Sequence, residues 1–173
     1  GVCSLLTVLA SPKGALDEVG EAVLQGAILE AWNAKKNKAR IDDVYDSLTR
    51  KIESGDYKDK PSIVVRISEL CELLSQYCTW GTFGEYFNSD SPSLSDDTKF
   101  AVLELLSLEK QPKLMSAILF SLILAIQDKM FHTPRNMKKL CIIDEGWRLL
   151  SGSNEHAARF IETGYRTVRR HRG

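Results

Sequence analysis

The sequence has few of the residues that build metal centres and hydrolytic triads. Its three histidines are scattered and lack cysteine or carboxylate partners at ligand or catalytic spacing, and its four cysteines form no C-x-x-C pair. A metal centre and a serine or cysteine hydrolase are therefore set aside. Each cysteine lies in an apolar run, and we expect reduced, buried thiols in a cytosolic protein (Cys3, Cys71, Cys78 and Cys141).

Net charge and long apolar segments are also lacking. Lysine plus arginine and aspartate plus glutamate both total 23, so no global field attracts nucleic acid or membrane. The longest apolar run, Leu114–Ile126, has about 13 residues, whereas a membrane-spanning helix needs about 20. The opening Gly1–Leu6 does not resemble a secretion signal, and we expect it to lie inside a longer protein.

A phosphate-binding loop is missing from the chain. None of its 11 glycines is followed by lysine, so the motif G-x-x-x-x-G-K-[ST] is absent. Backbone N–H groups of that loop hold the phosphates of a nucleotide. We therefore expect the chain alone to bind nucleotides poorly.

What is present begins with helical periodicity. Leu24, Ala27 and Ala31 recur at helical spacing in a first helix, which ends at the polar run 35–38. A second helix is predicted from Ile41 to Ile52, and a third begins at Pro61. The third is amphipathic, with an apolar face (Ile63, Ile67, Leu70, Cys71, Leu74 and Tyr77) opposite a polar one (Arg66, Glu69, Glu72 and Gln76).

The chain changes character after residue 79. Two glycines and four aromatic residues occupy Trp80–Phe87, and the following residues, 88–97, have the composition of a loop. The aromatic segment could be a binding loop, but we favour packing against the core. We expect residues 1–79 to be a mostly helical subregion and residues 80–173 to be part of an α/β core, the two together forming a single compact unit.

The second half has the pattern of a β-α-β unit. Lys99–Glu104 and Leu140–Asp144 are apolar runs of strand length, and a helix is predicted between them from Pro112 to about Phe131. Such a crossover gives parallel strands that are buried on both faces. Residues 154–170 have the periodicity of a covering helix, so the predicted fold class is α/β with a parallel sheet, preceded by the helical subregion.

Asp144 and Glu145 carry the most specific chemical signal. They follow an apolar strand, and open parallel sheets bind ligands beyond the carboxyl ends of their strands. In phosphate-loop ATPases a first acid there holds Mg²⁺ and a neighbouring one orients the attacking water. The alternative is an acidic pair that only solvates the strand end or caps a helix.

Arginines gather between Arg159 and Arg172 on one side of the last predicted helix. Guanidinium groups suit phosphate oxygens, either of a nucleotide in a neighbouring subunit or of a nucleic-acid backbone. A solvated charged face is an equal alternative.

Two blocks resemble a known family. The runs LCIIDEGWRLL, residues 140–150, and FIETGYRTVRRH, residues 160–171, are similar to the VirB-four-like ATPases of type IV secretion systems, and in particular to those of conjugative transfer. The resemblance extends through residues 80–88 and 100–105, and more faintly from residue 16 onward.

This resemblance implies part of a RecA-like P-loop NTPase domain that uses ATP and Mg²⁺. Asp144 would hold the metal, Glu145 would be catalytic, and Arg166, Arg169 and Arg170 would contact nucleotide. The family works as a hexamer at the cytoplasmic face of the inner membrane, where its partners are identical subunits and channel proteins. The phosphate loop is expected before residue 1 and a glutamine motif after Gly173, so this piece itself is expected to be inactive.

Two other functions stay open. The helical half could dock partners of a secretion channel without any enzymatic role, and the arginine face could bind nucleic acid.

Overall fold

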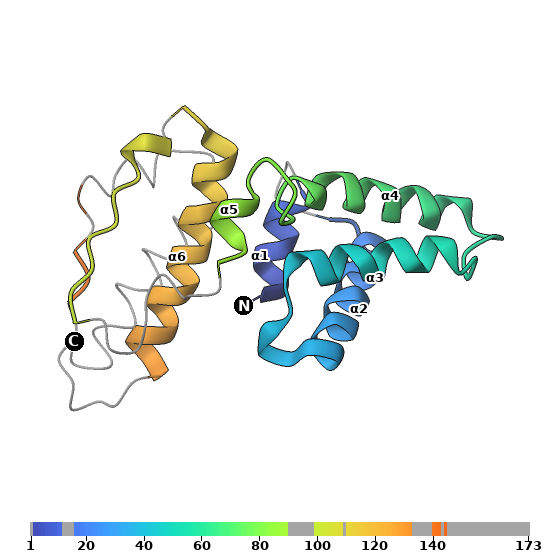
Figure 1. The fold of residues 1–173 in the computed structure, drawn as a ribbon, viewed down its shortest axis with the longest axis horizontal. Helices are drawn as coiled ribbons and strands as arrows, with labels where there is room; N and C mark the ends of the chain where they lie inside the picture. The colour runs from blue at the N-terminus through green and yellow to red at the C-terminus, as the bar shows by residue number, and fades with distance from the viewer. Residues whose placement is uncertain are drawn as a thin grey trace. The chain divides into compact units, whose positions relative to one another are not determined.

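The computed structural model describes residues 2–11, 16–89, 99–108, 110–132, 140–142 and 144. The chain divides into two compact units, Gly1–Thr98 and Lys99–Gly173, and each is described here by itself. Figure 1 shows the helices of both units. The aromatic segment after residue 79 falls in the first unit. Whether a RecA-like core begins at residue 80 stays a prediction.

The first unit is built from helices. Its elements are α1 (Val2–Leu9), α2 (Glu18–Lys35), the 3-10 turn η1 (Lys36–Lys38), α3 (Ile41–Glu53), α4 (Pro61–Ser75) and the short α5 (Gly84–Phe87). Helices α2, α3 and α4 contact one another, and α1 contacts α2 and α4. The three helices that periodicity predicted are confirmed, whereas α1 and α5 were not predicted.

Local signals explain where α2 begins and ends. The Asp17 carboxylate caps it by accepting a hydrogen bond of 2.9 Å from the backbone N–H of Gly20, and Glu18 and Glu21 lie in the first turn. At the other end Lys36 adopts a positive φ of 53°, which stops the helix, and η1 follows.

Helices α3 and α4 also begin at recognisable signals. The Arg40 backbone N–H donates a hydrogen bond of 2.8 Å to Asp43, and α4 starts at Pro61, where a missing N–H is harmless. The amphipathic pattern of α4 is confirmed, since Ile67, Leu70 and Leu74 are buried while its predicted polar residues are exposed. This face packs against the other helices and covers one side of the helical core.

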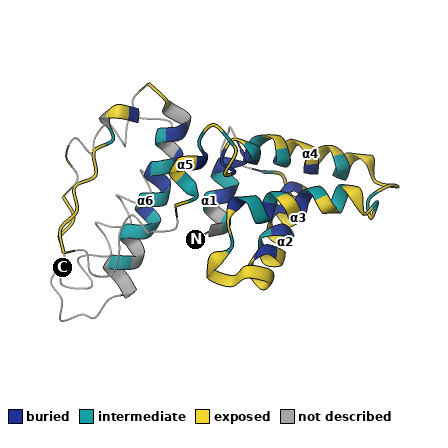
Figure 2. Cartoon of the chain, in the orientation of Figure 1, coloured by how far each residue is buried: buried dark blue, intermediate teal, exposed yellow. Residues whose placement is uncertain are grey.

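The core of the first unit lies among α1 to α4, and Figure 2 shows its buried positions in dark blue. Leu24, Leu48, Ile67 and Leu74 are almost completely excluded from solvent. Burial of such side chains contributes about 1.5–3 kcal/mol each. The remaining buried apolar residues are Leu6, Leu9, Ala10, Ala27, Ala31, Ile41, Val44, Leu70, Tyr77 and Cys78.

Aromatic rings hold the turn that follows α4. Tyr77 packs against Phe83 and edge-on against Phe87, at centroid distances of 5.6 and 5.3 Å. The prediction of core packing is therefore confirmed for these rings. It is wrong for Trp80 and Tyr86, which are exposed, although Trp80 meets the edge of Tyr45 at 5.4 Å.

The second unit contains η2 (Leu106–Leu108) and the long helix α6 (Pro112–His132). Leu119 and Ile123 on α6 form a small cluster with Leu105. The helix predicted between the two apolar runs is confirmed. The helix predicted at residues 154–170 lies outside the described residues.

The two predicted parallel strands are not confirmed. Residues 100–105 and 140–142 have no regular secondary structure, and no strand occurs anywhere in the described ranges. A strand exists through hydrogen bonds to a neighbouring strand, so an apolar run alone cannot make one. All four cysteines are free, as expected, but Cys141 is exposed and Cys3 and Cys71 are half-buried, so the expected burial holds for Cys78 alone.

Candidate functional site

The predicted acidic pair is represented in the described residues by Asp144. Its carboxylate is exposed and lies in a turn directly after the apolar run. In that run Leu140 and Ile142 are 83% and 80% exposed, and in the earlier run Phe100 is 84% exposed. The acid is thus accessible, and the apolar residues that should form the surrounding sheet are uncovered in this chain.

A role in holding Mg²⁺ was predicted for Asp144, and it stays a prediction. Magnesium is usually held by one or two carboxylates, with water and phosphate oxygens completing its shell. Within the described ranges no three histidine, cysteine, aspartate or glutamate side chains gather as a metal site.

The other predicted site residues lie outside the described residues. These are Glu145, Arg166, Arg169 and Arg170. Their roles in catalysis and in nucleotide binding therefore stay predictions.

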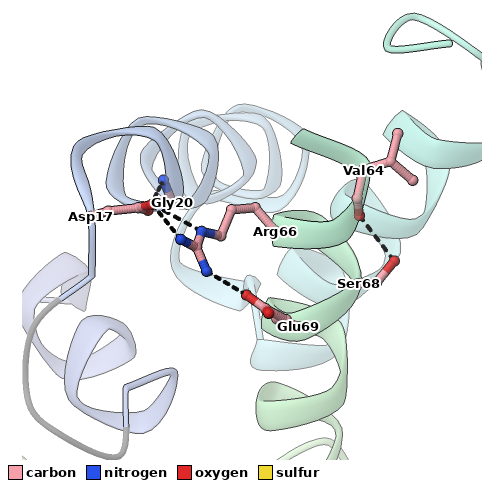
Figure 3. Close-up of polar contacts among 6 residues, drawn as sticks. All are labelled: Asp17, Gly20, Val64, Arg66, Ser68 and Glu69. Carbon is pink, nitrogen blue, oxygen red and sulfur yellow. Dashed lines mark hydrogen bonds and ion pairs between the residues drawn. The ribbon is translucent and has the colours of Figure 1, made fainter. Parts of the chain in front are cut away.

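In the helical unit a charged network joins the start of α2 to α4, and Figure 3 shows its members. The Arg66 guanidinium bridges Asp17 at 2.7 Å and Glu69 at 2.7 Å. The hydrogen bond from the Gly20 N–H, assisted by Arg66, lowers the pKa of Asp17. Sequence reasoning missed this link, because its two ends are 49 positions apart.

A second network joins α2 to α3 through Glu30. Its carboxylate accepts hydrogen bonds from the buried Ser47 hydroxyl and from Lys51, which is also its ion-pair partner. The hydrogen bond from Lys51, followed by that from Ser47, lowers the pKa of Glu30. Nearby, Lys35 forms an ion pair of 2.6 Å with Asp43. These groups are engaged in holding helices together, so none of them is a candidate for chemistry.

The outer face of α2 is a feature that sequence reasoning also missed. Val19, Leu29 and Trp32 are exposed although they lie on a helix that already buries Leu24 and Ala31. Apolar residues on two opposite sides of one helix were the available signal, since a helix of a lone soluble domain usually has one apolar stripe.

In the part of the chain that the structure describes, we find no helix whose length and apolar character would allow it to cross a membrane.

The sequence is also similar to known proteins. The family model described as the TraG P-loop domain matches residues 25–173. The chain is 54% identical over 168 residues to Protein TraC of Escherichia coli (strain K12), a match that covers 97% of this chain and 19% of that relative. The chain thus spans about a fifth of the length of the curated relative. No solved structure matches it.

Proposed function

This chain belongs to the TraG P-loop domain family, and on that premise we propose that it is part of an ATPase motor that powers conjugative transfer through a type IV secretion system. Residues 1–79 are the helical subregion of the motor, and residues 80–173 contribute part of its RecA-like core. The family match supports this proposal, because it covers the whole second half, including Asp144, Glu145 and the arginine segment.

The accessible carboxylate of Asp144 directly behind an apolar run is the observation that supports the site assignment. Exposed apolar side chains in residues 100–103 and 140–142 support the same idea, since central strands of a parallel sheet are apolar on both faces. We assign these segments to two parallel strands that pair in the complete domain, where helices cover them. Asp144 then stands at the carboxyl end of its strand, where nucleotides bind in such sheets.

Each predicted residue has a separate task in this proposal. Asp144 would hold Mg²⁺, and Glu145 would orient and deprotonate the attacking water. Arg166, Arg169 and Arg170 would contact phosphate oxygens of the nucleotide, which suit guanidinium groups. Magnesium that binds together with ATP would neutralise the charge that develops on the phosphates.

Partners and location follow from the same proposal. The partners are further copies of the motor and channel proteins at the inner membrane. The motor is cytoplasmic and reaches the membrane through those partners.

Phosphate release tests the function. It is measured for the 173-residue chain and for a longer protein that extends it until a G-x-x-x-x-G-K-[ST] loop is included, because the chain has no Gly-Lys step. We expect turnover from the longer protein and none from the chain alone.

Substitutions in the longer protein test the residues. Glu145→Gln is expected to lower kcat by about 100-fold or more, because the general base is lost. Asp144→Asn is expected to shift the magnesium dependence of turnover to higher concentration. Asp59→Asn, at an exposed turn of the helical unit, is the matched control. Turnover that survives Glu145→Gln would contradict the assignment.

A non-enzymatic docking module is the second candidate. The exposed apolar residues on α2 favour it, since apolar patches on soluble proteins mark interaction surfaces. If the longer protein binds no nucleotide and releases no phosphate, this candidate replaces the motor.

A further inference from the structure

The outer face of α2 is apolar in a part of the chain that the ATPase proposal does not use. Val19, Leu29 and Trp32 are 44%, 58% and 50% exposed. Ala22 is exposed between them, and Gly26 is half-buried. An α-helix has 3.6 residues per turn, so positions 19, 22, 26, 29 and 32 lie along one side of α2. We call these five residues the outer stripe.

The outer stripe is directed away from the core of its own unit. The buried residues Leu24, Ala27 and Ala31 occupy the opposite side of the same helix. A Cβ atom added at Gly26 would meet nothing within 4 Å. The stripe is therefore accessible along its length, and Figure 2 shows exposed positions in yellow toward the C-terminal end of α2 and in η1.

Side-chain size is unevenly distributed along the outer stripe. After Val19 at its start, the stripe has the small residues Ala22 and Gly26 in the first half of α2 and the bulky Leu29 and Trp32 in the second half. A helix that packs here needs large side chains opposite the first half and small ones opposite the second. A second α2 running in the opposite direction has this arrangement.

Charge along α2 has the same asymmetry. Glu18 and Glu21 lie in its first turn, while Lys36 and Lys38 lie in η1 just after its end, and all four are exposed. An antiparallel copy therefore brings acidic residues opposite basic ones. It also places the positive end of each helix dipole beside the negative end of the other. A parallel copy would place like charges and the two Trp32 rings together.

We propose that the outer stripe is the interface with a second copy of this chain, in which the two α2 helices pack antiparallel about a two-fold axis. In this register Leu29 of one copy lies over Gly26 of the other, and Trp32 lies over Ala22. Glu18 then faces Lys36. The glycine allows the helix axes to approach to the short end of the usual spacing of about 8–10 Å.

The interface rests on the surface of α2 alone and does not depend on nucleotide chemistry. A chain without any ATPase activity would still associate in this way. Failure of the motor proposal and failure of the interface are therefore separate results.

Sedimentation equilibrium of the 173-residue chain, from about 1 to 100 µM, tests the interface, because weak specific dimers dissociate in this range. We expect a monomer–dimer equilibrium. Gly26→Gln places a side chain in the approach site, and its Cβ meets nothing within 4 Å in the monomer. This variant and Leu29→Glu are each expected to raise the dissociation constant by about 10-fold or more. Val65→Glu, at an exposed apolar residue on α4, is the matched control and leaves the equilibrium unchanged.

Charge exchange tests the direction of the helices. Glu18→Lys and Lys36→Glu are each expected to weaken the dimer by about 3-fold, and the doubly exchanged chain to recover it, since each charge again faces its opposite. Absence of recovery would contradict the antiparallel register.

Three further results would overturn the interface. One is a monomer at every concentration. The second is a dimer whose dissociation constant changes with neither Gly26→Gln nor Leu29→Glu. The third is a monomeric chain in which Leu29→Glu lowers the melting temperature. That result would mean that another part of the same chain covers the outer stripe.

Discussion

Asp42 near the start of α3 holds the turn that follows α4 by accepting two hydrogen bonds from one residue, Thr79. The backbone N–H of Thr79 donates at 2.7 Å, and its hydroxyl donates to the other carboxylate oxygen. The two residues are 37 positions apart. This link fixes the segment where the chain leaves α4, next to the packed ring of Tyr77.

Removing this carboxylate should loosen the turn. Asp42→Ala is expected to lower the free energy of unfolding by about 1–2 kcal/mol, since two hydrogen bonds to a charged acceptor are lost at an exposed site. Urea unfolding followed by circular dichroism measures the change. Asp46→Ala, at an exposed acid on the same helix, is the control and is expected to change stability less. Equal losses for the two variants would mean that the Thr79 link contributes nothing.

The link between Glu30 and α3 predicts that the stability of the chain depends on pH. The pKa of Glu30 is lowered in the folded chain, so its stabilisation is complete above its ordinary value of 4.5 and is lost as the pH falls through the folded value. Glu30→Gln should therefore destabilise the chain at pH 7, by about 0.5 kcal/mol because the carboxylate is partly exposed, and have less effect near pH 3. Thermal unfolding between these pH values measures the difference. Glu72→Gln, at an exposed acid on α4, controls for the loss of one charge; a difference that stays constant with pH would argue against the Glu30 ion pair.

Glycine is required at position 81 by close backbone contact. A Cβ there would lie 2.1 Å from the Ser75 carbonyl oxygen, which belongs to backbone that cannot rotate away. Gly81→Ala is expected to lower the free energy of unfolding by about 2 kcal/mol or more. Gly26→Ala is the matched control, because its Cβ enters open space and alanine favours a helix by up to about 1 kcal/mol. Both are measured by urea unfolding at low protein concentration. Equal effects would show that the turn relaxes around the new methyl group.

Burial predicts an order of cysteine reactivity. Burial, assisted by the nearby Asp42 carboxylate, raises the pKa of Cys78 to about 12. Partial burial of the thiol also raises the pKa of Cys141, but this residue is exposed to the reagent. Alkylation requires the thiolate, so at pH 8 iodoacetamide should modify Cys141 first and Cys78 last. Peptide mass spectrometry over time gives both rates. In urea the two rates should converge. Early labelling of Cys78 without denaturant would contradict the packing of the turn that follows α4.

The helices could be predicted because their signals are local. The periodic apolar positions of α4, the capping Asp17 and the starting Pro61 all act within a few residues of the helix that they define. Helix α1 was missed because its run of 8 residues is short and has only two polar members, Ser4 and Thr7. Leu6 and Leu9 of this helix are buried.

Of the candidate site, Asp144 is the residue that the structure describes. Asp144 does follow an apolar run and is accessible, as the pattern indicated. The strand before it was not confirmed, because a strand requires partner strands whose hydrogen bonds no local pattern can provide. Glu145 and the three arginines stay predictions for the same chain.

The order of helices, the apolar face of α4 and the acid after an apolar run were determined by the sequence itself, since each depends on residues close together along the chain. The tertiary structure alone decided which distant side chains meet, as Asp17 meets Arg66 and Asp42 meets Thr79. It also left the outer side of α2 exposed, although that side carries Val19, Leu29 and Trp32. The physical reason is that burial and ion pairing depend on distances in space, and packing sets these distances only after the helices have formed.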